Sequence, residues 1–420
     1  IIVVNDNEMS IAENHGGLYQ NLKELRDTEG RSSCNFFRSL GLDYLYVGEG
    51  NDIPSLIAAF AKVKDTSRPT VVHIHTQKGK GYAPAEADRE EFHWEMPFDL
   101  ETGKPKVDCS GMEDYHSLTG KFLLEKMKED HTVVAISSGT PTVIGFTPER
   151  RKQAGRQFVD VGIAEEHAVA LASGIAAGGG RPVYGVYSTF IQRCYDQLSQ
   201  DLCINGNPAV ITVFMGTVAG MNDVTHLGFF DIPLISNIPN MVYLAPTCSE
   251  EYFAMLEWAV RQTEYPVAIR VPGAAVVHRK EEFDTDYSEL NRYKMTARGE
   301  TVAILALGAF YDLGQALKNK LREESGVEAT LINPRYITGL DEPMLEELKV
   351  GHRIVVTLED GVLDGGFGEK IARYYGNSEM RVLNYGLRKE FADRYNLDEL
   401  MKANRLTDKQ MAEDIAGILE

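Results

Sequence analysis

Short apolar segments that do not alternate with polar residues constrain the fold of this chain most strongly. Such segments suit parallel strands that helices cover on both faces. They are TVVHIHT (70–76), VVAISSG (133–139), PVYGVYS (182–188), AVITVF (209–214), MVYLAP (241–246), PVAIRV (266–271), TVAILALG (301–308) and RIVVTLED (353–360). Amphipathic stretches such as 118–130 and 249–262 lie between them and predict helices. This alternation predicts an α/β fold built from βαβ units in doubly wound sheets.

Two polar stretches that contain Pro or Gly interrupt the alternation, at residues 98–114 and 278–300. A chain of 420 residues is long enough for two or three domains. We therefore expect three α/β domains, at residues 1–105, 112–280 and 295–420, of which the first is short.

Composition excludes several classes of protein. The formal net charge is −19 and no block of Lys and Arg stands out, so we expect no nucleic-acid partner. The five cysteines are scattered without a CxxC pair, which indicates a reduced cytoplasmic protein rather than a disulfide framework or a zinc site. No apolar segment is long enough to cross a bilayer and no signal peptide is evident, so we expect no membrane partner.

The chain opens with four β-branched apolar residues, which predict a buried strand, followed by NDNEMSI (5–11). Ligands dock at strand ends in open α/β sheets, and an Asn side chain with a backbone carbonyl offers hard oxygen ligands for Mg²⁺ or Ca²⁺. An Asx turn that closes the strand explains the same residues. On this stretch alone, the Asx turn is the more economical interpretation.

A second candidate site is GIAEEHA (162–168), where a short strand leads into a helix whose first turn holds Glu165. A buried carboxylate there can exchange a proton with a heterocycle and favour one tautomer. Ordinary stabilisation of a helix N-terminus by acidic residues accounts for the pattern equally well. Small residues crowd the helix that follows and would allow close packing against a neighbour.

Three further stretches carry side chains suited to ligand binding. YSTFIQRCYDQ (187–197) places aromatic residues beside an arginine after a strand, which can stack a flat ligand, although core aromatics are the default explanation. GMNDVTHLGFFD (220–231) holds His226, and a lone loop histidine is weak support for acid–base chemistry. Lys78, Lys80 and nearby histidines follow the strand at 70–76 beside Gly-rich turns, so an anionic ligand fits there.

Taken in order along the chain, these motifs are far more specific than any one of them. The chain resembles the 1-deoxy-D-xylulose-5-phosphate synthase family of thiamine-diphosphate enzymes in the transketolase superfamily. The resemblance rests on NDNEMSI, TQKGKGYAPAE, FHWEMPF, GIAEEHA, YSTFIQRCYDQ, THLGFFD, LEDGVLDGGFGE (358–369) and VLNYGL (382–387). It implies a pyrophosphate-binding, a pyrimidine-binding and a C-terminal transketolase domain, which correspond to the three expected domains.

The resemblance also implies roles for particular residues and a reaction. Glu165 would hydrogen-bond the aminopyrimidine of thiamine diphosphate and promote loss of the proton at C2. The other implied roles are stacking on the pyrimidine (Phe190), lining of the pocket (Tyr187, Arg193), cofactor binding (Lys78), substrate proton transfer (His93, His226) and Mg²⁺ binding (the Asn7 side chain, the Met9 carbonyl). The family decarboxylates pyruvate and joins the two-carbon unit to D-glyceraldehyde 3-phosphate, for isoprenoid and thiamine synthesis, and it is dimeric, so we expect a homodimer.

The sequence departs from the family in four places. Met215 and Gly273 stand where the family has two arginines that are expected to grip the acceptor phosphate, and neither residue can replace the planar fork of arginine. Asn222 stands where the family has Asp. The GDG motif that supplies an Asp to the metal is absent, so we expect the chain to begin inside its first domain.

Three interpretations remain open. The chain could be a synthase with a rearranged phosphate site that uses Lys78, Lys80 or Arg193. It could be a paralogue that acts on a different or unphosphorylated aldehyde. The third interpretation, a catalytically silent binding or regulatory subunit, is disfavoured by the joint retention of Glu165, Phe190 and Asn7.

Overall fold

The structure, a computed structural model, describes residues 1–107, 111–273 and 275–419. Its contacts divide the chain into two units, of which the first holds Ile1–Met112 with Val161–Ile163 and the second holds Glu113–Asp160 with Ala164–Glu420. Cys109 and Ala274 fall outside the described residues. In the described part of the chain, no helix is long and apolar enough to cross a membrane.

The first unit is built on a parallel three-stranded sheet with the order β1-β3-β2. Its strands are β1 (Ile2–Asp6), β2 (Asp43–Val47) and β3 (Thr70–His75). Its helices are α1 (Gly17–Asp27), α2 (Phe36–Ser39), α3 (Ile53–Val63), α4 (Ala83–Ala87) and η1 (Glu91–His93). Val71 and Val72 belong to different core clusters, the first with residues of α1 and α2 and the second with residues of α3. Neighbouring residues of a strand face opposite ways, so helices cover both faces of this sheet.

The opening strand forms as predicted, but the prediction that it is buried is wrong. Ile1, Ile2 and Val3 are 59%, 49% and 47% exposed. These residues are exposed because β1 lies at the edge of its sheet and pairs with β3 alone among the described strands.

A parallel six-stranded sheet with the order β5-β4-β6-β7-β9-β8 opens the second unit. Its strands are β4 (Val133–Ser137), β5 (Phe158–Asp160), β6 (Arg181–Tyr187), β7 (Val210–Phe214), β8 (Val242–Leu244) and β9 (Val267–Arg270). The longer helices around it are α5 (Tyr115–Glu129), α6 (Pro148–Ala154), α7 (Glu165–Ala177), α9 (Asp231–Ser236) and α10 (Ser249–Arg261). Short turns are η2 (Pro141–Ile144), η3 (Gly155–Gln157), η4 (Phe190–Cys194), α8 (Tyr195–Gln197) and η5 (Leu198–Cys203).

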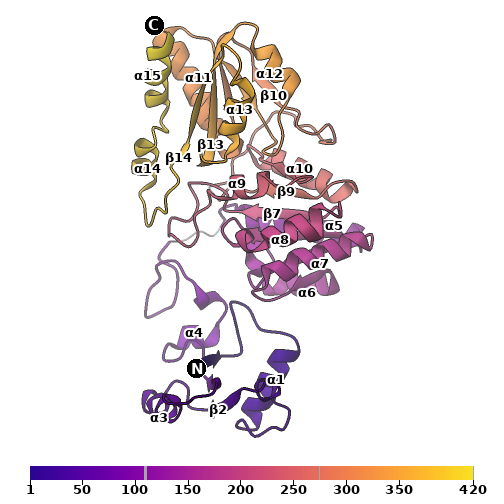
Figure 1. The fold of residues 1–420 in the computed structure, drawn as a ribbon, viewed down its shortest axis with the longest axis vertical. Helices are drawn as coiled ribbons and strands as arrows, with labels where there is room; N and C mark the ends of the chain where they lie inside the picture. Colours follow the sequence, from indigo (N-terminus) through magenta and orange to yellow (C-terminus); the bar gives the residue numbers. More distant parts are fainter. Residues whose placement is uncertain (108–110, 274, 420) are drawn as a thin grey trace. The chain divides into compact units, whose positions relative to one another are not determined.

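The rest of the second unit is a five-stranded sheet with the order β10-β12-β11-β13-β14, in which β10 alone runs antiparallel to its neighbour. Its strands are β10 (Lys294–Ala297), β11 (Thr301–Ala306), β12 (Thr330–Asn333), β13 (His352–Val362) and β14 (Arg381–Leu387). Its helices are η6 (Gly308–Phe310), α11 (Tyr311–Ser325), α12 (Glu342–Leu348), α13 (Phe367–Tyr375), α14 (Leu397–Ala403) and α15 (Asp408–Leu419). Figure 1 shows α11 and α15 on one side of this sheet and α12 and α13 on the other.

The eight apolar segments that predicted strands all form strands, and each runs parallel to its neighbours in its sheet. The predicted helices at 118–130 and 249–262 correspond to α5 and α10. The predicted α/β class with parallel sheets is therefore confirmed.

Candidate active site

Glu165 is the first residue of α7, and its side chain is buried at 3% exposure. The positive end of the helix dipole favours a carboxylate in this position. Arg193, from η4, donates from Nη1 to Glu165 Oε2 over 2.9 Å, and its own side chain is 53% exposed. The structure therefore brings these two predicted site residues together as an ion pair with a buried carboxylate and a solvent-facing guanidinium.

Three aromatic rings predicted to bind the cofactor or substrate also meet in the second unit. Tyr187 ends β6 and Phe190 begins η4, and their ring centroids lie 5.4 Å apart at nearly a right angle. The ring of His226 lies 5.3 Å from Phe190 and 6.1 Å from Tyr187. We call Tyr187, Phe190 and His226 the aromatic cluster. Because η4 carries both Phe190 and Arg193, one turn joins the cluster to the Glu165 ion pair.

His116 extends this cluster and was missed by the sequence analysis. Its ring stacks on Phe214 with centroids 4.7 Å apart and lies 6.3 Å from Tyr187. Its Nδ1 lies 2.6 Å from the carbonyl oxygen of Val143, and burial lowers the pKa of His116. Only the tertiary fold brings this first turn of α5 next to β6 and β7, so the local sequence held no signal for it.

Thiamine diphosphate is the cofactor that the resemblance implies, and the residues of the second unit fit its aminopyrimidine ring. Glu165 offers a buried carboxylate, and the aromatic cluster, which η4 links to Glu165 through Arg193, offers ring faces. Between Tyr187 and Phe190, the hydroxyl oxygens of Ser188 and Thr189 are buried and have no hydrogen-bond partner among the described residues. Unpartnered hydroxyls beside flat side chains suit the nitrogen atoms of a heterocycle.

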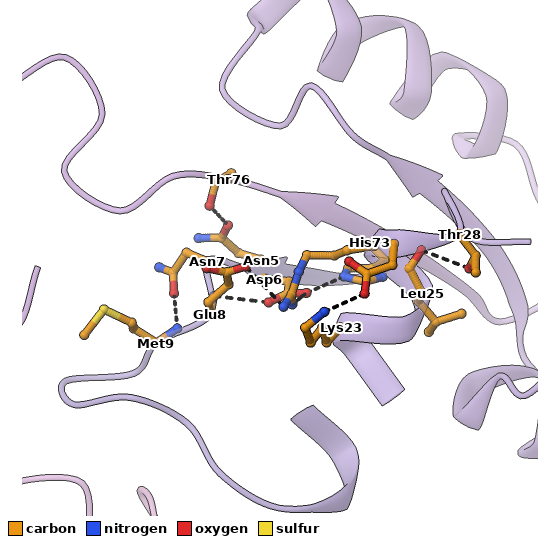
Figure 2. A network of polar contacts seen from close by, with 12 residues as sticks. Asn5, Asp6, Asn7, Glu8, Met9, Lys23, Leu25, Thr28, His73 and Thr76 are labelled. Atoms are coloured by element: carbon orange, nitrogen blue, oxygen red, sulfur yellow. Dashed lines mark hydrogen bonds and ion pairs between the residues drawn. The ribbon is translucent and has the colours of Figure 1, made fainter. Parts of the chain in front are cut away.

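In the first unit, NDNEMSI folds as a set of side-chain–backbone turns at the end of β1 (Figure 2). Asn7 Oδ1 accepts a hydrogen bond from the Met9 amide over 3.1 Å, and Asp6 Oδ1 accepts one from the Glu8 amide over 3.2 Å. Glu8 between them has a φ of 68°. The Asx turn, which was the economical interpretation of this stretch, is therefore present.

The Asp6 carboxylate is the centre of a buried polar network at this strand end (Figure 2). His73 Nε2 lies 2.9 Å from Asp6 Oδ2. The other ring nitrogen of His73 lies 2.6 Å from the Tyr44 hydroxyl. Arg26, from α1, forms an ion pair with the same carboxylate oxygen. Burial raises the pKa of Asp6, but the bonds from His73 and Arg26 outweigh this and hold it at about 2. The network fixes the end of β1 just before Asn7.

For Mg²⁺, the residues of the first unit supply part of a ligand set. An amide oxygen has two lone pairs, so Asn7 Oδ1 can bind a cation while it accepts the Met9 amide. Together with the Met9 carbonyl this would give two oxygen ligands, of the kind that Mg²⁺ takes beside water and substrate phosphates. In the described ranges, no group of three or more His, Cys, Asp or Glu side chains is placed to hold a metal ion.

Lys78 and His93 also lie in the first unit, whereas Glu165 and His226 lie in the second. Lys78 Nζ donates to the carbonyl oxygens of Ser10 and Ile11 over 2.8 and 3.3 Å, so it ties the turn after Met9 to the end of β3. Burial and the charge of Lys78 lower the pKa of His93, which favours a neutral imidazole.

Met215 and Gly273, the two departures from the expected arginines, are in contact with each other. A Cβ atom placed on Gly273 would lie 2.1 Å from Met215 Sδ. The thioether therefore covers the glycine, and any larger residue at 273 would displace it. Arg270, the arginine that this motif retains, is buried in ion pairs with Asp231 and Asp360. It is therefore not placed to bind a substrate.

Two family profiles match the second unit. The profile described as the transketolase pyrimidine binding domain matches residues 113–276. The profile described as the transketolase C-terminal domain matches residues 292–411.

Curated relatives match nearly the whole chain. A 1-deoxy-D-xylulose-5-phosphate synthase of Clostridium botulinum is 32% identical, over 96% of this chain and 70% of the relative. The corresponding protein of Clostridium beijerinckii is 33% identical, over 97% of this chain and 71% of the relative. That of Clostridium tetani is 32% identical and matches 100% of this chain and 73% of its own length.

Solved structures show the same fold. A structure described as a split-gene transketolase, an inactive β4 tetramer, has a TM-score of 0.60 at 21% identity and covers 72% of this chain and 96% of its own. A transketolase of Pichia stipitis has a TM-score of 0.60 at 14% identity and covers 99% of this chain and 71% of its own. The transketolase-type fold expected from the sequence is therefore confirmed.

Proposed function

The chain belongs to the 1-deoxy-D-xylulose-5-phosphate synthase family, and from this premise we propose that it is a thiamine-diphosphate-dependent transferase that joins a two-carbon unit from pyruvate to an aldehyde. The acceptor of the family reaction is D-glyceraldehyde 3-phosphate, and the products are 1-deoxy-D-xylulose 5-phosphate and CO₂. The observation that carries the proposal is the buried Glu165 carboxylate beside the aromatic cluster.

Bound thiamine diphosphate would supply the electron sink for decarboxylation. Glu165 would hold a proton at the ring nitrogen of the aminopyrimidine, because its carboxylate is buried and fixed at the start of α7. Phe190 would stack on the pyrimidine ring, and Tyr187, whose ring meets that of Phe190 at nearly a right angle, would line the pocket with Arg193.

His226 would transfer protons to and from the substrate. Its Nδ1 lies 3.1 Å from Asp223 Oδ1 and 2.8 Å from Thr225 Oγ1. These contacts orient the imidazole and leave Nε2 as the nitrogen for proton transfer. We assign His93 the same kind of task on the strength of the family motif FHWEMPF.

Four finer assignments belong to the same proposal. Mg²⁺ would be held by the Asn7 side chain and the Met9 carbonyl, and Lys78 would support that turn through Ser10 and Ile11. We further propose that the protein acts as a homodimer in the cytoplasm, as the family pattern and the scattered cysteines suggest.

A paralogue that uses an unphosphorylated aldehyde is the second candidate function, and the contact between Met215 and Gly273 favours it. An apolar contact thus stands where the family has two arginine guanidinium groups. A phosphate dianion gains charge-assisted hydrogen bonds from arginine and none from a thioether.

The two candidate functions, synthase and paralogue, differ in the aldehyde acceptor that the enzyme prefers. The full chain, with thiamine diphosphate and Mg²⁺, would be given pyruvate with D-glyceraldehyde 3-phosphate or with D-glyceraldehyde, and the ketose product measured. A synthase prefers the phosphorylated acceptor, so a higher kcat/KM for D-glyceraldehyde would overturn that assignment and support the paralogue. No ketose from either acceptor would contradict both and support a silent binding subunit.

A further inference from the structure

We propose that the C-terminal domain positions His226 for catalysis, and that Tyr395 and Asp393 are its positioning residues. We call residues 215–230 the His226 loop and residues 393–395 the clamp. The clamp lies between β14 and α14, in the yellow segment that extends away from the third sheet in Figure 1. The catalytic role of His226 rests on the proposed function, whereas the contacts described next do not.

The two ends of the His226 loop are packed into the core of the C-terminal domain. Val218, Leu227 and Phe229 are at most 2% exposed and belong to one hydrophobic cluster with residues of β11, β13 and α11. Phe230 makes a ring contact with Phe391, just before the clamp, with centroids 5.7 Å apart. The loop therefore follows β7 of the pyrimidine-binding domain, but its two ends are buried against the neighbouring domain.

Between these anchors, the clamp holds the loop by hydrogen bonds close to His226. The amide of Arg394 donates to the carbonyl oxygen of Asn222 over 2.6 Å, and Asn222 Nδ2 donates to the carbonyl oxygen of Tyr395 over 3.1 Å. The amide of Val224 donates to Asp393 Oδ1 over 3.1 Å. The clamp thus binds residues two and four positions before His226.

Tyr395 adds a hydrogen bond at the start of the loop. Its hydroxyl donates to the carbonyl oxygen of Val218 over 2.7 Å and lies 3.4 Å from that of Met221. Beyond the histidine, Arg270 Nη2 donates to the carbonyl oxygen of Gly228 over 3.0 Å and ion-pairs with Asp360 of the C-terminal domain. The backbone is therefore fixed on both sides of His226 by contacts that involve this domain.

These contacts give a physical reason for Asn222, which stands where the family has Asp. The side-chain nitrogen of asparagine donates to the Tyr395 carbonyl, and an ionised carboxylate has no hydrogen to donate. The residue at 222 is thus matched to the clamp. The clamp thereby fixes the position of the His226 ring, whose centroid lies 5.3 Å from that of Phe190.

Tyr395→Phe removes one hydroxyl and keeps the ring, and Tyr385→Phe is its matched control. Tyr385 lies on β14 of the same domain, and its hydroxyl donates to Asp414 of α15 rather than to the loop. We expect Tyr395→Phe to lower kcat roughly ten-fold, since small displacements of a reacting group cost one to two orders of magnitude. The control should keep its kcat, and both variants should keep the thermal midpoint within a few degrees of each other.

A double variant tests whether the effect of Tyr395 on kcat depends on His226. In a His226→Ala background, Tyr395→Phe should have no further effect on kcat, because the group that it positions is gone. A full ten-fold loss in that background, or equal losses in Tyr395→Phe and Tyr385→Phe, would overturn the proposal.

Amide hydrogen exchange tests the clamp without any turnover. Asp393→Ala removes the acceptor of the Val224 amide, so exchange in residues 218–226 should accelerate at least ten-fold while exchange in β14 stays unchanged. Unchanged exchange in 218–226 would overturn the clamp. Absence of ketose formation by the wild type, with accelerated exchange in the variant, would instead contradict the proposed function alone.

Discussion

Phe190 contributes one flat face to the candidate site and lies one turn from the arginine that pairs with Glu165. Phe190→Ala removes that face, and an aromatic contact of this kind contributes about 1 kcal/mol beyond its buried area. We expect the Kd for thiamine diphosphate to rise about ten-fold, as measured by calorimetry. Tyr195→Ala is the control, because Tyr195 is an exposed aromatic that bonds Asn237 outside the cluster. An equal rise in both variants would argue against stacking by Phe190.

Asp6 predicts a pH dependence of stability for the first unit. Its pKa is about 2 in the folded protein and 3.8 ordinarily, because His73 and Arg26 outweigh its burial. A lowered pKa stabilises the fold above the ordinary value and loses this effect as pH falls through the folded value. The carboxylate therefore contributes about 2 kcal/mol above pH 4, which disappears between pH 4 and pH 2.

The measurement compares wild type with Asp6→Asn by denaturant unfolding, followed through exchange of β3 amides. The difference in unfolding free energy should be largest near pH 5 and should shrink as the pH approaches 2. The exposed Asp65 serves as the control, and Asp65→Asn should show no such change. A difference for Asp6→Asn that is constant from pH 5 to pH 2 would refute the assignment.

At the scale of elements, the end of β9 joins the two domains of the second unit through buried charge. Arg270 lies between Asp231 of α9 and Asp360 of β13, and all three side chains are at most 2% exposed. Arg270→Met would leave two buried carboxylates without their cation, which costs about 3–5 kcal/mol. We expect a loss of that size in the free energy of unfolding, measured in urea.

A surface pair provides the matched comparison. Arg298 and Glu347 are 73% and 51% exposed, so Arg298→Met should cost at most about 1 kcal/mol. If Arg270→Met cost no more than Arg298→Met, the buried cluster would not hold the domains together.

An element can be predicted from the sequence when residues close together in the chain determine its structure. Parallel strands such as β7 and β13 carry their apolar pattern within a few residues, so the sequence identified them. The exposure of β1 depends on which strands pair with it, and its composition alone suggested burial.

The residues of the candidate site likewise fall into those that the local sequence predicts and those that it does not. Glu165, Phe190 and Arg193 belong to compact motifs, so the sequence alone predicts them as site residues. His116 and the clamp at Asp393–Tyr395 reach the site only through contacts between segments distant in the chain. No local pattern marks such residues.

For the whole molecule, the proposed activity depends on one carboxylate, that of Glu165. The direct measurement is the rate of CO₂ release and ketose formation from pyruvate and D-glyceraldehyde 3-phosphate, with Glu165→Gln compared with Glu166→Gln. Glu166 is the exposed neighbour in the same first turn of α7 and serves as the matched control. We predict a loss of about 10²- to 10⁴-fold for Glu165→Gln and a near wild-type rate for Glu166→Gln. A Glu165→Gln variant that turns over at the wild-type rate would contradict the proposed role of Glu165 in proton transfer to the cofactor.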